Sequence, residues 1–108
     1  MSELLQTIVG LVTKRDLRIS VHGYEDLAAD RIAVRDVLDG IEGAVLIREY
    51  LSYAKGLSIL VLQRDSQGRP IHVVWGIRKK TQSPAVMVTA YRPDHDIWET
   101  DWVTRRKR

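Results

Sequence analysis

The spacing of apolar residues changes along the chain, and this change limits the folds that the chain can adopt. Over roughly the first 40 residues, apolar side chains recur every three or four positions, which is the period of an amphipathic helix. After that they alternate with polar residues or form short continuous runs, which is typical of strands. Helices followed by strands favour an α+β domain, with the helices covering one face of an antiparallel sheet.

Three helical segments are expected in the first part of the chain. The first follows Ser2, and the second runs from about His22 to Asp30. Ser20 precedes the second segment, and both serines are residue types that cap helix N-termini. The third segment, AVRDVLDGI, is expected to end near Gly40. The apolar stripes are Leu4, Leu5, Ile8, Val9, Leu11 and Val12 in the first helix and Tyr24, Leu27, Ala28 and Ile32 in the second.

Four strands are expected in the second part, in the segments AVLIREYL, LSILVLQR, PIHVVWGIR and AVMVTAYR. The residues between the middle two include Asp, Ser and Gly, which favour a tight reversal. An antiparallel hairpin with its turn at Asp65 to Arg69 is therefore predicted. The predicted fold has two or three N-terminal helices packed on one face of a four-stranded antiparallel sheet.

Alternation within the strands assigns residues to the two faces of this sheet. The almost entirely apolar class is expected to face the helices, with Trp75 among its central members. The opposite class is more polar, so we expect His72 to lie on a half-open face where a ligand could reach it. The class assigned to the helices is Val45, Ile47, Ile59, Val61, Ile71, Val73, Trp75, Ile77, Val86 and Val88. The opposite class is Arg48, Tyr50, Arg64, His72, Arg78, Thr89 and Tyr91, together with Leu60, Leu62 and Val74.

Composition narrows the kind of protein further. A chain of 108 residues with 44% apolar content suits one globular domain. There is no cysteine, which excludes disulfides, thiolate metal sites and a cysteine nucleophile. The N-terminus fits neither a signal peptide nor a membrane span, so a cytoplasmic location without a membrane partner is expected. The expected divisions are an N-terminal helix at 1–16, an α+β domain at 17–104 and the basic tail RRKR at 105–108.

Histidine and aspartate offer one candidate metal site. His22 and Asp26 stand four residues apart on the second helix, a spacing that can hold a divalent ion, and His72 could complete the set. The chain has no HExxH pattern and no third ligand fixed by spacing. We therefore assign no metal and no cofactor, and interpret these residues as ordinary surface charge. His95, in a polar loop after the last strand, is expected to be solvated.

Several of these segments resemble a known family. ISVHGYEDLAADRIAVRDVLDGI, SILVLQRDSQGRPIHVVWGI and VMVTAYRPD with a following Trp are similar to the bacterial domain-of-unknown-function family 4258, from about Ile19 to Trp98. The family is considered related in fold to RelE-like and BrnT-like ribonuclease toxins. The resemblance implies an active face built from His22, His72, Thr89 and Tyr91. Where many members have arginines, this chain has Asp26 and Asp30, which repel phosphate and weaken the case for RNA cleavage.

The resemblance suggests an RNA-interacting protein or a degenerate metal-independent ribonuclease. In that chemistry His22 and His72 would act as base and acid and Tyr91 as a proton donor. Arg48 and Arg78 would bind phosphate, with Thr89 beside them. The partners would be RNA or a cognate antitoxin-like protein.

The competing hypothesis is a non-catalytic protein-interaction module that docks a partner, or a second copy of the chain, through the sheet face or edge. Its expected anchors are Tyr50, Tyr53 and Trp98, each of which could equally be buried at the rim of the core.

Overall fold

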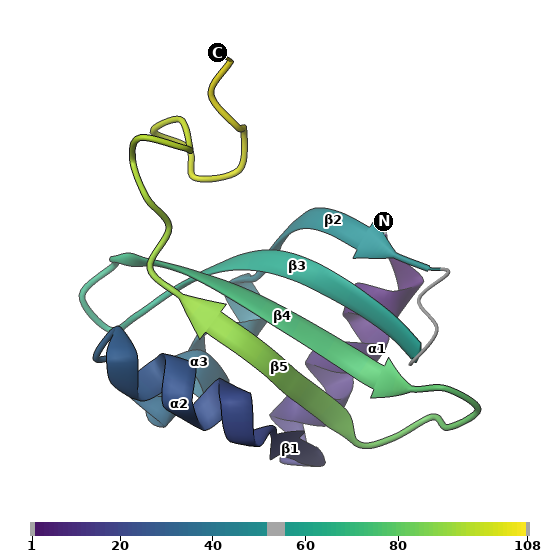
Figure 1. Ribbon diagram of the computed structural model, residues 1–108. Helices are drawn as coiled ribbons and strands as arrows, with labels where there is room; N and C mark the ends of the chain where they lie inside the picture. The colour runs from purple at the N-terminus through teal and green to yellow at the C-terminus, as the bar shows by residue number, and fades with distance from the viewer. Residues whose placement is uncertain (1, 52–55, 108) are drawn as a thin grey trace.

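The computed structural model describes residues 2–51 and 56–107 and has two layers, with helices on one side of a single sheet (Figure 1). The N-terminal part has three α-helices, a 3₁₀ helix and one short strand, and four longer strands follow. Within the described residues, no helix has the length and apolar character needed to cross a membrane. The elements are α1 (Glu3–Thr13), β1 (Leu17–Ile19), α2 (Val21–Ala29), α3 (Val34–Asp39), a 3₁₀ helix η1 (Gly40–Gly43), β2 (Val45–Tyr50), β3 (Gly56–Arg64), β4 (Pro70–Arg78) and β5 (Ala85–Tyr91).

The helix starts follow the local sequence, as predicted. The side chain of Ser2 accepts a hydrogen bond from the Leu5 N–H at 3.1 Å, and that of Ser20 accepts one from the Gly23 N–H at 2.9 Å. Each serine thus satisfies a donor that the first helical turn leaves without an intrahelical partner. The third helix ends at Asp39 with Gly40 as its C-cap, close to the predicted boundary.

The sheet has five strands in the order β1-β5-β4-β3-β2, so the prediction of four antiparallel strands was incomplete. The additional strand β1 pairs in parallel with β5. It has only three residues, too few to show an alternating pattern. The β3–β4 hairpin is confirmed, because Arg64 pairs with Pro70 and the Asp65 N–H donates to the Arg69 carbonyl at 3.0 Å.

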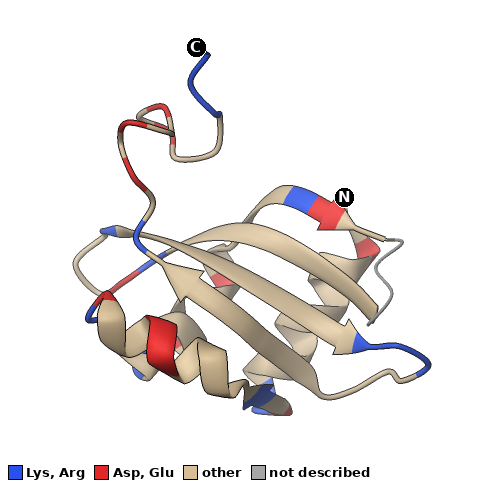
Figure 2. Ribbon diagram, viewed as in Figure 1, with Lys and Arg blue, Asp and Glu red and all other residues tan. Residues whose placement is uncertain are grey.

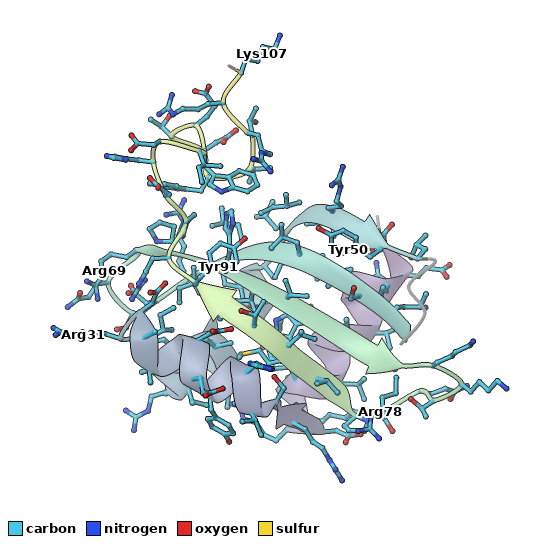
Figure 3. All side chains as sticks on the ribbon, viewed as in Figure 1. Arg31, Tyr50, Arg69, Arg78, Tyr91 and Lys107 are labelled. Atoms are coloured by element: carbon cyan, nitrogen blue, oxygen red, sulfur yellow. The ribbon has the colours of Figure 1, made fainter. Side chains whose placement is uncertain are left out.

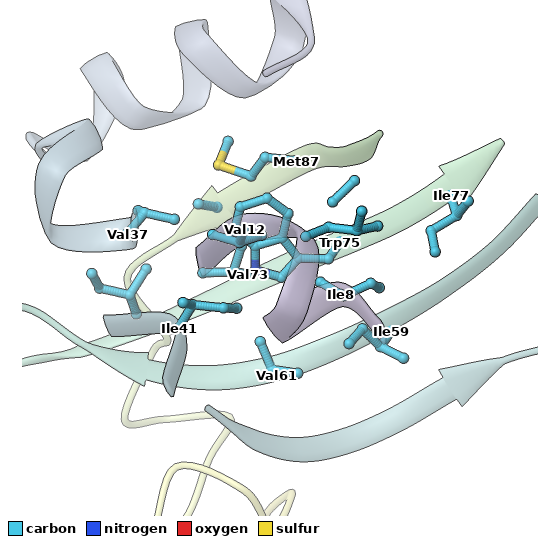
Figure 4. Close-up of a cluster of buried hydrophobic side chains, with 14 of the residues drawn as sticks. Ile8, Val12, Val37, Ile41, Ile59, Val61, Val73, Trp75, Ile77 and Met87 are labelled. Carbon is cyan, nitrogen blue, oxygen red and sulfur yellow. The ribbon is translucent and has the colours of Figure 1, made fainter. Parts of the chain in front are cut away.

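The core lies between the helices and the face of the sheet that they cover, here called the helix-covered face (Figure 4). Trp75 is fully buried there, as predicted, and its indole N–H donates to Gln63 Oε1 at 2.8 Å. Gln63 in turn donates through Nε2 to the Val37 carbonyl at 2.7 Å. A chain of hydrogen bonds therefore satisfies the polar atoms buried in this layer and ties β4 and β3 to α3.

In β2 and β5 the predicted phase is correct on one side of a bulge and wrong on the other. Arg48, Tyr50, Thr89 and Tyr91 lie on the face away from the helices, as predicted, but Val45 and Val86 lie there too and do not face the helices. In β5, Ala85, Met87 and Ala90 are buried in the core, while Val88 is 42% exposed. In β2, Leu46 packs against the core and Val45 is 49% exposed. The pairing register of β2 with β3 shifts between Leu46 and Arg48, and that of β5 with β4 shifts where Val88 is the extra residue. A bulge adds one residue and reverses the alternation beyond it, which simple counting cannot detect.

Helix α2 lies close to strand β5. A Cβ placed on Gly23 would come within 2.7 Å of the Met87 side chain and 3.0 Å of its carbonyl oxygen, so glycine permits this approach. Further along the chain, Asp26 accepts a hydrogen bond from the Thr89 hydroxyl at 2.5 Å, and Asp30 accepts one from the Arg92 N–H at 2.7 Å. The two aspartates therefore attach α2 to the last strand.

Candidate functional site

The face of the sheet turned away from the helices, here called the second face, is organised in rows that cross the strands. The pairing registers give each row directly, because residues opposite one another share a face. One row is Val45, Leu62, His72 and Tyr91; the next is Arg48, Leu60, Val74 and Thr89; the third is Tyr50, Ser58, Gly76, Val86 and Arg18.

A small C-terminal hairpin, residues 94–106, covers the first of these rows. Trp98 pairs with Arg105 across the hairpin, and the Arg106 N–H donates to the Ile97 carbonyl at 2.8 Å. The segment leaves the end of β5 on the side opposite the helices (Figure 1). Residues 105 and 106, predicted to belong to a basic tail, are thus built into the hairpin.

His72 is fully buried beneath this hairpin. Alternation assigned it to the correct face, but the prediction that this position is half-open was wrong. Because a carbonyl oxygen can only accept, the imidazole donates through Nε2 to the Trp102 carbonyl at 2.6 Å. Its Nδ1 then accepts from the Tyr91 hydroxyl, 3.4 Å away. The Trp98 ring packs edge-on against it with centroids 4.6 Å apart.

Burial sets the protonation preferences of this pair. Desolvation lowers the pKa of His72 below 6.5, partly opposed by its hydrogen bond to the Trp102 backbone. Burial likewise raises the pKa of Tyr91 above 10.0; the Tyr50 hydroxyl adds to this rise and Arg105 opposes it. Both groups are therefore neutral at pH 7.

The other predicted site residues are scattered. His22 lies on the outer surface of α2, with its side chain 89% exposed and Nδ1 3.6 Å from Glu25 Oε1. The structure brings His72 and Tyr91 together but does not bring His22 to them. Asp26, which was considered as a metal ligand together with His22, instead accepts a hydrogen bond from the Thr89 hydroxyl.

The predicted protein anchors also have different surroundings. Trp98 is buried against His72, at 8% exposure, and is not available as a surface anchor. Tyr50 is half-buried on the second face, and the Arg48 guanidinium lies 6.0 Å from its ring centroid. Tyr53 lies outside the described residues.

Beyond the hairpin, the second face is hollowed by a groove of about 420 Å³. It follows the third row, where Ser58 and Gly76 are the small residues between Tyr50 and Val86. Arg78 also lines it, and the register places Arg78 on the same face as Tyr50; both residues are labelled in Figure 3. Alternation along the strands does not predict this groove, although Ser58 and Gly76 are small residues within strands of mostly larger ones.

Charge is segregated between the two faces of the sheet. Register places Arg18, Arg48, Arg64 and Arg78 on the second face. Among the residues of the five strands, all of which the structure describes, the one carboxylate is that of Glu49. It is hydrogen-bonded to the Ser2 hydroxyl at the start of α1, on the helix side. Figure 2 shows blue segments at β2 and at the end of β4, with red beside the blue on β2.

These features define the class of protein: a small α+β domain whose sheet has one helix-covered face and one partly open, arginine-bearing face. The chain belongs to the family described as Domain of unknown function (DUF4258), whose model matches residues 19–92. The match confirms the family predicted from the sequence; all of α1 and the C-terminal hairpin lie outside the matched residues. No curated protein and no solved structure matches the chain.

Proposed function

We propose that this domain binds RNA across the open part of its second face and holds it without cleaving it, in a toxin-like fold related to the RelE and BrnT proteins. The segregation of charge carries the proposal. Four strands contribute one arginine each to the face, and the sheet adds no carboxylate there. Such a face attracts phosphates and releases their counterions on binding. A cytoplasmic location suits this activity.

The placement of the histidines supports the non-cleaving part of the proposal. Acid–base catalysis needs a group within hydrogen-bond reach of the proton that moves. His72 is fully buried and both of its nitrogens are engaged. His22 lies on the outer side of α2. No described position offers two histidines to one phosphate.

Three carboxylates around this face already have partners within the fold. In the hairpin, Glu99 pairs with Arg106 at 3.2 Å, and Asp101 accepts hydrogen bonds from the N–H groups of Val103 and Thr104. Asp26 is bonded to Thr89 at the edge of β5. These carboxylates hold the fold together, and the arginines on β2 and β4 remain exposed.

Fluorescence anisotropy with a labelled single-stranded RNA oligonucleotide tests the binding. We expect affinity that falls steeply with salt and that drops about tenfold in Arg78→Glu, with the salt slope reduced by about one. Arg35→Glu is the matched control, because Arg35 is an exposed arginine on α3 in the helix layer. An equal loss in both variants would overturn the proposed surface.

A denaturing gel of RNA incubated with the protein tests the absence of cleavage. We expect intact RNA. If the wild-type protein cleaves RNA and His72→Ala does not, the proposal of binding without cleavage is wrong and His72 is catalytic. If the wild-type protein binds no RNA at all, the protein-interaction hypothesis, with the half-buried Tyr50 as an anchor, replaces this proposal.

A further inference from the structure

The groove on the second face results from residue size along one row of the sheet. In the neighbouring row, Leu60 and Val74 fill the space above β3 and β4, whereas the third row has Ser58 and Gly76 at the same strands. Gly76 contributes no side chain at all, and its backbone forms the floor of the groove. Two flanking side chains, Tyr50 on β2 and Val86 on β5, close the sides.

The groove combines an apolar bed with one cationic end. Most of its lining is aliphatic, and Arg78 is the charged residue among the lining residues that the structure describes. The ring of Tyr50 offers a flat aromatic surface, with Arg48 as a second cation 6.0 Å from its centroid. The hydroxyl of Ser58 is a hydrogen-bonding group on the floor. A volume of about 420 Å³ falls within the range of small-ligand sites and far below what a duplex requires.

We propose that this groove is a subsite for a single unpaired nucleotide. The base lies on the Ser58–Gly76 floor against the Tyr50 ring, and Arg78 binds the adjacent phosphate. The inference rests on the proposed RNA-binding function and makes it specific for single strands, because bases stack on aromatic side chains only when they are unpaired. Charge complementarity favours this occupant over an acyl chain, which would leave Arg78 without a partner, and over a basic peptide, which Arg78 and Arg48 would repel.

Filling the groove is the direct test. Ser58→Leu places an aliphatic side chain in the groove, in a strand that already carries leucines. Ser66→Leu makes the same change in the exposed β3–β4 turn and is the matched control. We expect Ser58→Leu to weaken single-stranded RNA binding at least about fivefold in fluorescence anisotropy, and Ser66→Leu to leave it unchanged. Circular dichroism verifies that both variants are folded.

Nuclear magnetic resonance with 5′-AMP locates the subsite independently of RNA. We expect the amide shifts to gather at Ser58, Gly76 and Val86 and the side-chain Nε–H of Arg78 to move, and we expect Ser58→Leu to abolish these changes. Shifts confined to the C-terminal hairpin, or no shifts, would overturn the inference.

The proposed RNA-binding function and the proposed nucleotide subsite can be refuted independently. If Ser58→Leu binds RNA as tightly as the wild type, the subsite is wrong while RNA binding stands. If 5′-AMP binds in the groove and RNA does not bind, the nucleotide subsite stands and the proposed function fails.

Discussion

The two faces of the sheet are built from the same strands, yet they are covered in different ways. Helices bury the whole central part of the helix-covered face, where Ile59, Val73 and Trp75 have no exposed surface. The second face is covered at one end by the C-terminal hairpin and is hollow at the other. The comparison shows that alternation assigns a residue to a face but does not say whether anything covers that face. Coverage comes from segments that are distant in the sequence.

The largest expected effect lies on the helix-covered face. Trp75→Ala should lower the free energy of unfolding by about 3 to 5 kcal/mol, because it leaves a cavity and removes a hydrogen bond from buried Gln63. Urea denaturation followed by circular dichroism measures the loss. A cost below about 1 kcal/mol would mean that this face is not the main core.

A pair of substitutions in β5 tests which residues face the helices. Met87→Ala should cost about 2 to 5 kcal/mol, because Met87 is fully buried in the core. Val88→Ala should cost about 0.5 kcal/mol or less, because Val88 is a 42% exposed bulge residue. The same denaturation experiment compares the two. A larger loss of stability for Val88→Ala than for Met87→Ala would support the phase predicted by simple alternation and would contradict the bulge.

On the second face, Trp98→Ala should cost less, about 1 to 2 kcal/mol. The ring packs on His72, but the backbone of the hairpin pairs with itself and, among the described residues, not with a strand of the sheet, so it can detach without unfolding the sheet. Hydrogen exchange distinguishes this local effect from a global one. We expect the hairpin amides to lose protection and the amides of β3 and β4 to keep theirs. Equal loss in both would show that the two faces form one cooperative core.

The smallest effect is expected from the protonation of His72 as the pH falls. Burial lowers the pKa of folded His72 below the value of 6.5 expected for the unfolded chain, so the unfolded state binds the proton more readily. The contribution of neutral His72 to stability is therefore complete above about pH 6.5 and is lost as the pH falls through the lower, folded pKa. Thermal melts between pH 5 and pH 8 measure this dependence.

His72→Gln is the matched variant for this experiment. A glutamine amide can still donate to the Trp102 carbonyl but does not titrate in this range. We expect its stability to change less with pH between pH 5 and pH 8 than that of the wild type. An identical pH dependence in both proteins would assign the effect to another group.

The sequence predicted which residues of the candidate site share a face, but it did not predict the groove or the position of His22. Alternation placed His72, Arg48 and Arg78 on one face, and register confirms that shared face. The predicted pairing of His72 with His22 required the position of α2 relative to β4, which no local pattern encodes. The groove required four strands to be in register, because Ser58 and Gly76 form a hollow only when they lie side by side between Tyr50 and Val86.

The sequence by itself determined the features that depend on near neighbours. Ser2 and Ser20 cap helices because each reaches an N–H three residues away, and the Asp65–Arg69 turn closes within five residues. Three features depend on the tertiary structure: the three-residue strand β1, the bulges that shift the side-chain alternation within β2 and β5, and the burial of His72. That burial depends on Trp102, 30 residues further along the chain, whose carbonyl accepts the imidazole hydrogen bond. Local hydrogen bonds and apolar spacing are encoded within a few residues, whereas burial depends on which distant segment packs on a given face.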